Sequence, residues 1–378
     1  MYQLKGKIDS TNAHEFENAI LAAKPSEIDA SDLEYISSAG LRVLMKLKKA
    51  VSDVTVLNVS PEVYEILDIT GFTSILNVQK AIREIDLTGK EIIAQGGNGT
   101  VYRLDDETIV KLYKPDYPME KIERERRYAK AAFVSGIPSV IAYDTVRSGD
   151  SYGVMYEAIN SDTLSHAMVS DPEHLDEYIG KYVAFVRKIH STPIIGDEIT
   201  PLKSFLRSRV SSADMLLFCE QSEVDVLLGI IDAMADGDTL AHGDLHPGNI
   251  MLQNGELMLI DMGEATRGTA IYDVANIYRD LISGPKTQPD VIRVSVGMEP
   301  EMALAVGRKF LMQYSGSQDE EQFERYLGML GLVYAFAVVC FIPDIPMNRE
   351  QFGAGIVQNL LRPVVLPNAD TLKGILSR

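Results

Sequence analysis

The sequence has few cysteines and no segment typical of a secretion signal or a bilayer span. Its 378 residues include two cysteines, Cys219 and Cys340. Neither has metal-ligand spacing, so we expect reduced core thiols in a cytoplasmic protein. The start of the chain lacks an apolar signal core. The most hydrophobic stretch, residues 327–342, is short for a span of roughly 20 residues, which predicts a buried helix and no membrane attachment.

Basic residues are scarce relative to acidic ones. The chain has 36 Lys and Arg against 54 Asp and Glu, a formal net charge of −18. Because nucleic acids require a basic face on a protein, we expect no nucleic-acid partner. The acidic excess could favour a cationic substrate or simply keep the surface solvated; we favour the second interpretation.

The length predicts two or three domains of about 150 residues each. Residues 1–85 alternate between strand and helix patterns, which predicts a small α/β domain. Its expected elements are a strand at 2–8, a helix at 11–23, a strand near Ile28, a helix at 40–51, a buried strand at 54–57 and a helix from Pro61. The short polar stretch 83–90 marks the expected boundary.

Three segments of this part carry a family resemblance. Leu4–Asp9, Glu34–Leu41 and Leu67–Phe72 resemble the STAS domain of anti-sigma factor antagonists. The resemblance implies a regulatory or partner-docking domain and a phosphorylated serine, which corresponds to Ser38. The residue before that serine is often Asp in the family but is Ser37 here. A serine at this place can also simply cap the following helix.

One loop carries the most specific pattern in the chain. His242–Asn249 reads His-Gly-Asp-Leu-His-Pro-Gly-Asn, and Asp261 opens the triplet Asp-Met-Gly. The spacing H-x-D-x-x-x-x-N followed by D-x-G is that of kinase catalytic and metal loops. Phosphoryl transfer needs a carboxylate that orients and deprotonates a hydroxyl, and oxygen ligands that hold Mg²⁺ against ATP phosphates. We therefore predict Asp244 as the catalytic carboxylate and Asn249 and Asp261 as metal ligands.

The amino-acid sequence of this loop resembles that of the aminoglycoside phosphotransferase and choline kinase-like family more than that of protein kinases. The resemblance covers residues 86–378. It implies an α+β bilobal protein-kinase-like fold, with an N-lobe at 86–158 and a mainly helical C-lobe at 159–378. It also implies an ATP-dependent phosphotransferase with an alcohol group as acceptor.

A glycine-rich segment and a lysine strand precede the loop. Gly96, Gly97, Asn98 and Gly99 would let backbone amides approach phosphate oxygens, although the same residues also suit a hairpin turn. Lys111 lies in the apolar strand 108–113, where an unpaired ammonium is costly. We therefore expect an ATP phosphate and a helical carboxylate beside it.

The helix expected at 118–135 supplies that carboxylate. We choose Glu125, because it shares a face with buried residues, and Glu123 is the next choice. After the strand that begins at Gly153, the resemblance implies that the adenine edge pairs with the backbone of Glu157 and Ile159.

The acceptor is expected to be a small molecule. Residues 262–272 are too few for the peptide-docking activation segment of protein kinases, and no A-P-E motif follows. The leading hypothesis is an ATP- and Mg²⁺-dependent kinase of a sugar, an amino alcohol or an aminoglycoside-like compound. The alternatives are a signalling kinase that phosphorylates Ser38 or a partner STAS protein, and a nucleotide-binding scaffold without turnover.

Overall fold

The computed structural model describes residues 1–345 and 349–377, and the chain divides into two units. Unit 1 comprises residues 1–86 together with 146–150, and unit 2 comprises residues 87–145 and 151–378.

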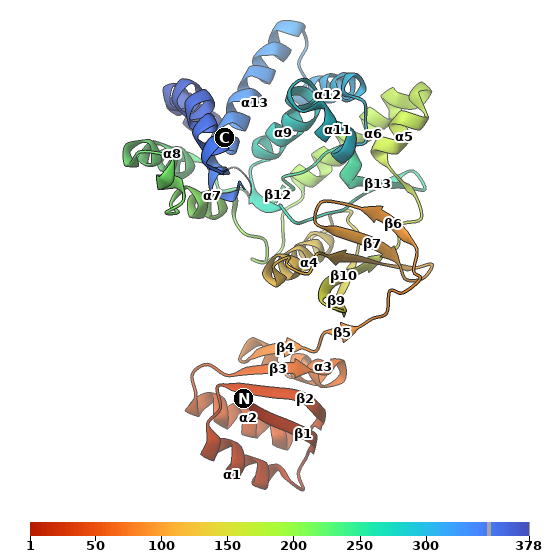
Figure 1. Ribbon diagram of the computed structural model, residues 1–378, viewed down its shortest axis with the longest axis vertical. Coiled ribbons are helices and arrows are strands. Elements are labelled where there is room, and N and C mark those ends of the chain that lie inside the picture. Colours follow the sequence, from red (N-terminus) through yellow and green to blue (C-terminus); the bar gives the residue numbers. More distant parts are fainter. Residues whose placement is uncertain (346–348, 378) are drawn as a thin grey trace. The chain divides into compact units, whose positions relative to one another are not determined.

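Unit 1 alternates strands and helices (Figure 1). Four strands pair in parallel in the order β1-β2-β3-β4, and such pairing requires a crossover between successive strands. The helices α1, α2 and α3 supply these crossovers. Within unit 1, the short strand β5 also pairs in parallel with Val146 and Arg147. The elements are β1 (Tyr2–Ile8), α1 (Ala13–Ala23), β2 (Glu27–Ile36), α2 (Ser38–Ala50), β3 (Thr55–Val59), α3 (Pro61–Ile69), β4 (Asn77–Lys80) and β5 (Arg83–Glu84).

Apolar side chains from the strands and helices form the core of unit 1. Ile20, Ile28, Leu47 and Val59 are fully buried there. The helix expected from residue 11 begins two residues later, because the Asp9 carboxylate accepts the backbone N–H of Thr11 and holds a turn ahead of the helix.

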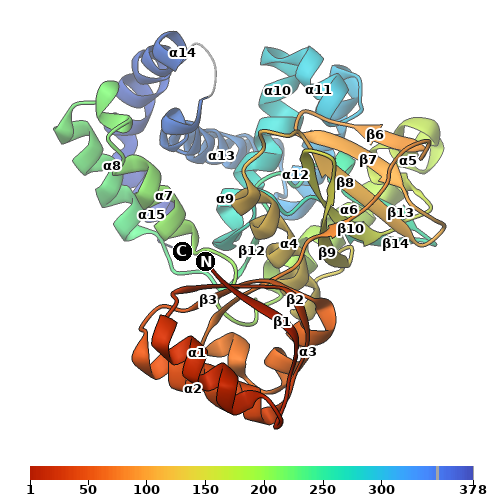
Figure 2. The ribbon, with the colours of Figure 1, turned by 60° about the horizontal axis from the view of Figure 1, so that its bottom comes forward.

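Unit 2 begins with an antiparallel sheet and one long helix. The strand order is β9-β10-β8-β7-β6, and α4 lies against the sheet (Figure 2). The bounds are β6 (Ile92–Gln95), β7 (Gly99–Arg103), β8 (Thr108–Tyr113), α4 (Met119–Val134), β9 (Ala142–Ser148) and β10 (Ser151–Glu157).

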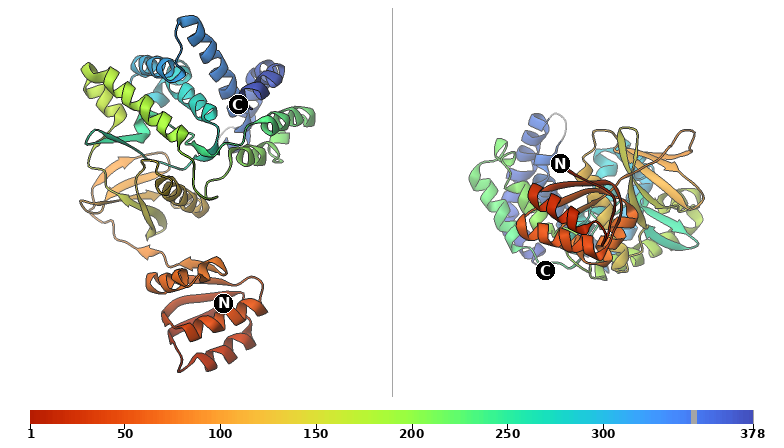
Figure 3. Two further views of the ribbon diagram at one scale, coloured as in Figure 1. Left: turned by 180° about the vertical axis from the view of Figure 1, so that it is seen from behind. Right: turned by 90° about the horizontal axis from the view of Figure 1, so that it is seen from below.

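The rest of unit 2 is mainly helical, and Figure 3 shows the helices gathered away from the β6–β10 sheet. Its helices are α5 (Leu164–Ser170), α6 (Leu175–Ser191), α7 (Leu202–Val210), α8 (Gln221–Ala233), α9 (Ala270–Tyr278), α10 (Gly284–Thr287), α11 (Pro289–Ser295), α12 (Pro300–Ser315), α13 (Glu320–Cys340), α14 (Arg349–Ile356) and α15 (Ala369–Leu376), with π-helical turns at η5 (Arg279–Ser283) and η7 (Val357–Val365). The short strands are β11 (Asp162–Thr163), β12 (Thr239–Ala241), β13 (Ile250–Gln253), β14 (Glu256–Leu259) and β15 (Thr266–Gly268).

The helix α13 contains the most apolar stretch. Among the described residues it is the one helix whose length and composition would suffice for a membrane span, and half of its apolar window is buried inside the protein. Phe323, Leu330 and Phe336 are fully buried in the core of unit 2. These contacts are those of a core helix.

Candidate active site

Lys111 on β8 lies between two carboxylates. Its Nζ is 2.8 Å from Glu125 Oε1 and 3.2 Å from Asp261 Oδ2. Burial disfavours the ammonium, but the attraction of Glu125 and Asp261 outweighs burial and raises the pKa of Lys111. An ammonium has three donors, so Lys111 retains a donor for an anionic ligand while it contacts both carboxylates.

Glu125 on α4 is buried, with 3% of its surface exposed. Besides Lys111, it accepts hydrogen bonds from the hydroxyl of Tyr113 at 2.8 Å and that of Tyr156 at 3.1 Å. Glu123 lies elsewhere, where it accepts from Arg126 at 2.8 Å. Between the two candidate glutamates, the structure therefore places Glu125 beside Lys111.

The glycine-rich segment forms the tip of the hairpin between β6 and β7. Gly96 N–H donates to Gly99 O at 2.9 Å. A Cβ at Gly99 would lie 2.2 Å from Leu112 O, so β7 approaches β8 too closely for a side chain there. The hairpin tip lies outside the lining of the neighbouring cavity, and its role toward phosphate stays a prediction.

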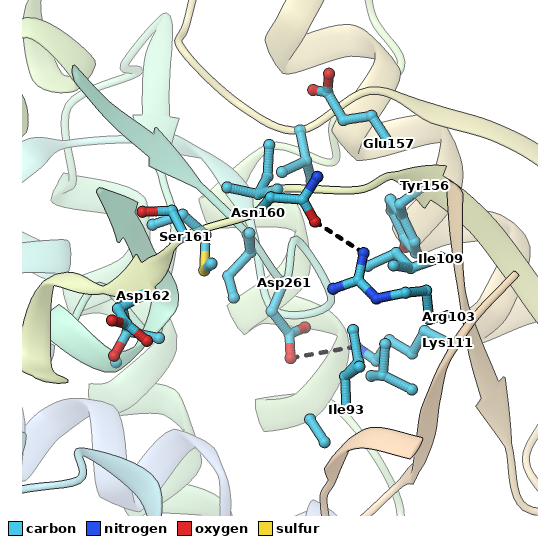
Figure 4. Close-up of a pocket in the computed structure, with 18 of the residues that line it drawn as sticks. Ile93, Arg103, Ile109, Lys111, Tyr156, Glu157, Asn160, Ser161, Asp162 and Asp261 are labelled. Atoms are coloured by element: carbon cyan, nitrogen blue, oxygen red, sulfur yellow. Dashed lines mark hydrogen bonds and ion pairs between the residues drawn. The ribbon is translucent and has the colours of Figure 1, made fainter. Parts of the chain in front are cut away.

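A cavity of about 770 Å³ lies beside Lys111 (Figure 4). Its lining includes Ile109, Ile159 and Ile260, together with the charged pair Lys111 and Asp261. Its size and its mixture of an apolar wall with a few polar groups are typical of small-ligand sites.

Two polar residues of this cavity were not predicted from the sequence. Arg103 on β7 donates from Nη1 to Asn160 Oδ1 at 2.8 Å, across the cavity shown in Figure 4. Since side chains two positions apart on a strand share a face, the match of Val101 to the kinase glycine-loop pattern could have indicated Arg103.

The two residues expected to pair with adenine lie along the same cavity. Glu157 and Ile159 both contribute to the lining. The N–H of Glu157 donates to Ile141 O at 3.0 Å, and its carboxylate accepts from Ile141 N–H at 2.7 Å. The Glu157 amide is thus engaged within the protein, and the pairing of an adenine edge with this backbone stays a prediction.

Asp244 lies in a network of hydrogen-bond donors. Asn249 Nδ2 donates to its Oδ2 at 2.9 Å, Arg279 Nη2 to its Oδ1 at 2.7 Å, and His246 Nε2 lies 3.5 Å from Oδ2. Burial opposes the charged carboxylate, but the hydrogen bond and charge of His246 and the charge of Arg279 hold the pKa of Asp244 well below its usual value. Asp244 is therefore ionised and oriented.

Arg279 is a second residue that the sequence did not single out. It lies in η5, and it also donates from Nε to Asp280 Oδ1 at 2.7 Å and from Nη2 to Asp280 Oδ2 at 2.9 Å. Burial raises the pKa of Asp280, and Arg279 opposes that shift. The Arg279 guanidinium thus donates hydrogen bonds to both Asp244 and Asp280.

Asp273 braces the backbone of the loop His242–Asn249. Its carboxylate is fully buried and accepts from His242 N–H at 3.0 Å and from Gly243 N–H at 2.8 Å, and His190 Nε2 lies 2.9 Å away. Asp273 lies in the first turn of α9, whose N-cap residue is Thr269. It thus links the start of this helix to the loop backbone.

Asn249 and Asp261 lie on neighbouring segments of backbone. The N–H of Ile260 donates to Asn249 O at 3.0 Å. Asn249 uses Nδ2 for both Asp244 O and Asp244 Oδ2, so these two contacts leave its side-chain oxygen available for a metal ion. Asp261 has a left-handed backbone, φ 61°, and a half-exposed side chain. One carboxylate and one amide oxygen suit Mg²⁺, which takes few protein ligands and completes its shell with phosphates and water.

The segment after Asp261 is short and held in place. β15 pairs antiparallel with β12, and α9 begins at Ala270. A Cβ at Gly237 would lie 2.2 Å from Gly268 O, so the end of β15 packs closely on the residues before β12.

Ser38 in unit 1 is the exposed first residue of α2. The cap is provided by Ser37 instead, whose Oγ accepts from Ala39 N–H at 3.2 Å. The interpretation of Ser38 as the capping residue is therefore wrong, because α2 begins two residues earlier than expected. Phosphorylation of Ser38 stays a prediction.

Comparison with known proteins identifies both parts of the chain. Residues 91–305 match the model of the phosphotransferase enzyme family. The chain belongs to this family. Residues 1–85 match the STAS domain, and BtrV of Bordetella bronchiseptica, a provisionally assigned anti-sigma factor antagonist, is 36% identical over 85 residues, 20% of this chain and 72% of BtrV.

Several solved structures resemble the chain at low identity. A complex of streptomycin, ATP and APH(2")-IIa is 15% identical, with 80% of this chain and 97% of that chain covered and a TM-score of 0.45. A choline/ethanolamine kinase family protein from Mesorhizobium loti is 11% identical, with 76% and 92% covered and a TM-score of 0.45. Amicoumacin kinase hAmiN with AMP-PNP, Ca²⁺ and Ami is 12% identical, with 82% and 96% covered and a TM-score of 0.42.

The family memberships confirm three predictions from the sequence. These are the two resemblances, the fold class of a STAS domain followed by a kinase-like fold, and the enzyme class of a phosphotransferase acting on an alcohol group.

Proposed function

We propose that residues 86–378 transfer the γ-phosphate of ATP, with Mg²⁺, to a hydroxyl group of a small molecule. The supporting observation is an unbroken set of contacts through the site. It runs from Lys111 to Asp261, from the neighbouring Ile260 to Asn249, and from Asn249 to Asp244. The groups that we propose for phosphate, metal and acceptor are thus connected.

Each group has a distinct task in this proposal. Lys111 binds the phosphates of ATP, and Asn249 and Asp261 hold Mg²⁺, which neutralises charge on the transferring phosphate. Asp244 orients the acceptor hydroxyl and takes its proton as the hydroxyl oxygen bonds to the γ-phosphorus. The bond between that phosphorus and the bridging oxygen breaks, and ADP leaves.

The short segment after Asp261 supports a small-molecule acceptor. Because β15 pairs with β12 directly after the metal loop, this part of the chain has no room for the long segment on which protein kinases dock a peptide. Sugars, amino alcohols and aminoglycoside-like compounds are the acceptor classes to test.

The test is transfer from Mg·ATP by the full chain to a panel of hydroxyl compounds, measured by ADP release and by the mass of the phosphorylated product. Asp244→Asn should bind ATP but lose transfer by about 10²- to 10⁴-fold. Asp290→Asn, at an exposed ion pair with Arg293, should transfer as the wild type does. Absence of Mg·ATP binding in calorimetry would refute the proposal.

A second candidate is a kinase that phosphorylates Ser38 or a partner STAS protein. The exposure of Ser38 at the first turn of α2 favours it, since a phosphate there would meet backbone N–H groups and a favourable helix dipole. Labelled phosphate on Ser38 that disappears in Asp244→Asn would support this candidate over a small-molecule acceptor.

We further propose that the STAS domain regulates the enzyme or docks a protein partner in the cytoplasm. Deletion of residues 1–85 should then change regulation or assembly more than the chemical step. This is tested by comparing transfer by the full and shortened chains at equal concentration.

A further inference from the structure

Two buried tyrosines share the carboxylate that holds Lys111. Tyr113 OH donates to Glu125 Oε2 at 2.8 Å, and Tyr156 OH donates to Glu125 Oε1 at 3.1 Å. Both tyrosines are buried, as is Glu125. The two hydroxyls come from neighbouring strands, β8 and β10, whose pairing fixes their separation.

These contacts satisfy both oxygens of Glu125. Oε1 accepts from Lys111 and from Tyr156, and Oε2 accepts from Tyr113. A buried carboxylate is stable only when it is hydrogen-bonded and paired. Since Lys111 contacts only Oε1, the Tyr113 hydroxyl holds the second oxygen, and the two hydroxyls together fix the rotation of the carboxylate.

Because the hydroxyls are neutral donors, they leave Lys111 as the cation that pairs with Glu125. They stabilise the charge of Glu125 without a second cation that would compete for phosphate. Burial, and then the neighbouring Glu125, raise the pKa of Tyr156. Burial also raises the pKa of Tyr113, helped by Tyr156 and Glu125. Both side chains therefore remain protonated donors.

The loop that contains Asp261 and Gly263 packs against the same carboxylate. A Cβ at Gly263 would lie 3.4 Å from Glu125 Oε2 and 3.5 Å from Asp261 Oδ1. Arg124 Nη2, from the residue before Glu125, donates to Gly263 O at 3.0 Å. The position of Glu125 is thus tied to the sheet by the tyrosines and to the metal loop by α4.

We propose that Tyr113 and Tyr156 are positioning residues, which hold Glu125 so that the Lys111 ammonium faces the phosphates of the bound nucleotide. The inference rests on the proposed function, in which Lys111 binds ATP. It adds that the two hydroxyls act on nucleotide affinity through Lys111 and not through general stability.

The experiment is a double-mutant cycle on the affinity of the full chain for Mg·AMP-PNP, measured by calorimetry. Tyr113→Phe and Tyr156→Phe should each weaken binding by about three- to tenfold, because each removes one hydrogen bond to a charged group. Tyr117→Phe is the matched control: its ring stacks on Tyr113 with centroids 4.8 Å apart, and its affinity should be that of the wild type.

The Lys111→Met background separates positioning from a merely structural role. Lys111→Met alone should weaken binding by about tenfold or more, and the tyrosine substitutions should then weaken it no further. If the tyrosine effect persists without Lys111, or if both variants bind as the wild type does, the inference is overturned. If Lys111→Met itself binds normally, the proposed nucleotide site fails instead.

Glu125→Gln provides a second route if the tyrosine variants do not fold. The amide keeps the shape of the side chain, but its NH2 group cannot accept from the hydroxyl that faces it, its oxygen is a weaker acceptor for the other hydroxyl, and it gives Lys111 no opposite charge. Affinity should fall by about tenfold or more. Unchanged affinity in this variant would also overturn the inference.

Discussion

Arg279→Met should destabilise the protein by an amount that depends on pH. In the structure Arg279 makes three contacts with acids: 2.7 Å to Asp244 Oδ1, 2.7 Å to Asp280 Oδ1 and 2.9 Å to Asp280 Oδ2. The side chain of Asp280 is 10% exposed, whereas that of Asp244 is 40% exposed. Removal of the guanidinium therefore leaves one acid buried without its cation and the other partly solvated.

The magnitude follows from these exposures. Removal of one partner of a fully buried ion pair costs about 3–5 kcal/mol, and water at Asp244 should reduce this to about 2–4 kcal/mol near neutral pH. Burial raises the pKa of Asp280, and without Arg279 it rises further. A group whose folded pKa lies above its unfolded value stabilises the fold at low pH and loses that contribution as pH rises through the folded pKa. The destabilisation should therefore shrink on acidification.

Urea unfolding followed by circular dichroism, at several values between about pH 5 and pH 8, measures this difference. Arg293→Met is the control, since Arg293 forms exposed ion pairs with Asp290 and Glu299 and should contribute only about 0–1 kcal/mol. The reasoning would be refuted if Arg279→Met lowered the free energy of unfolding by less than about 1 kcal/mol, or if the loss did not change with pH.

Three further predictions concern the metal ligand, the hairpin and the unit boundary. Asp261→Asn should bind AMP-PNP with the same affinity in the presence and absence of Mg²⁺, and a wild-type Mg²⁺ dependence in calorimetry would contradict its assignment as a ligand. Gly99→Ala should lower the melting temperature, with a cost of about 1–3 kcal/mol, because its Cβ would lie 2.2 Å from Leu112 O; Gly97→Ala, whose Cβ would meet nothing within 4 Å, should not. A chain of residues 86–378 should fold and bind Mg·ATP, and its failure to bind would contradict the two-domain interpretation.

Local sequence signals predicted the elements of the fold well where a single physical rule dominates. Pro61 marks the start of α3, as expected from its fixed φ and missing N–H. The start of α2 was placed too late, because Ser37 and Ser38 are both plausible caps and the choice depends on which hydroxyl reaches Ala39 N–H. Such a choice depends on backbone geometry that residue type alone does not specify.

In the candidate site, too, some residues follow from local sequence patterns and others do not. Asp244, Asn249 and Asp261 follow from spacing, because the chemistry needs those groups at nearly fixed intervals. Lys111 follows from its charge within an apolar strand. Arg279 lies 35 residues beyond Asp244, and no local pattern relates two residues that meet only through packing of separate helices and loops.

The charges around Asp244 also bear on the choice of acceptor. The net charge of −18 favours cationic partners at long range, but charges beyond about 8–10 Å are largely screened at physiological salt. Asp244 contacts the guanidinium of Arg279 and lies beside His246. Burial lowers the pKa of His246, but the hydrogen bond and the charge of Asp244 outweigh burial and raise it. An acceptor bound at Asp244 would therefore meet cationic and anionic groups together. The charge of the whole chain is thus a poor guide to the acceptor, and a transfer screen should include anionic as well as cationic hydroxyl compounds.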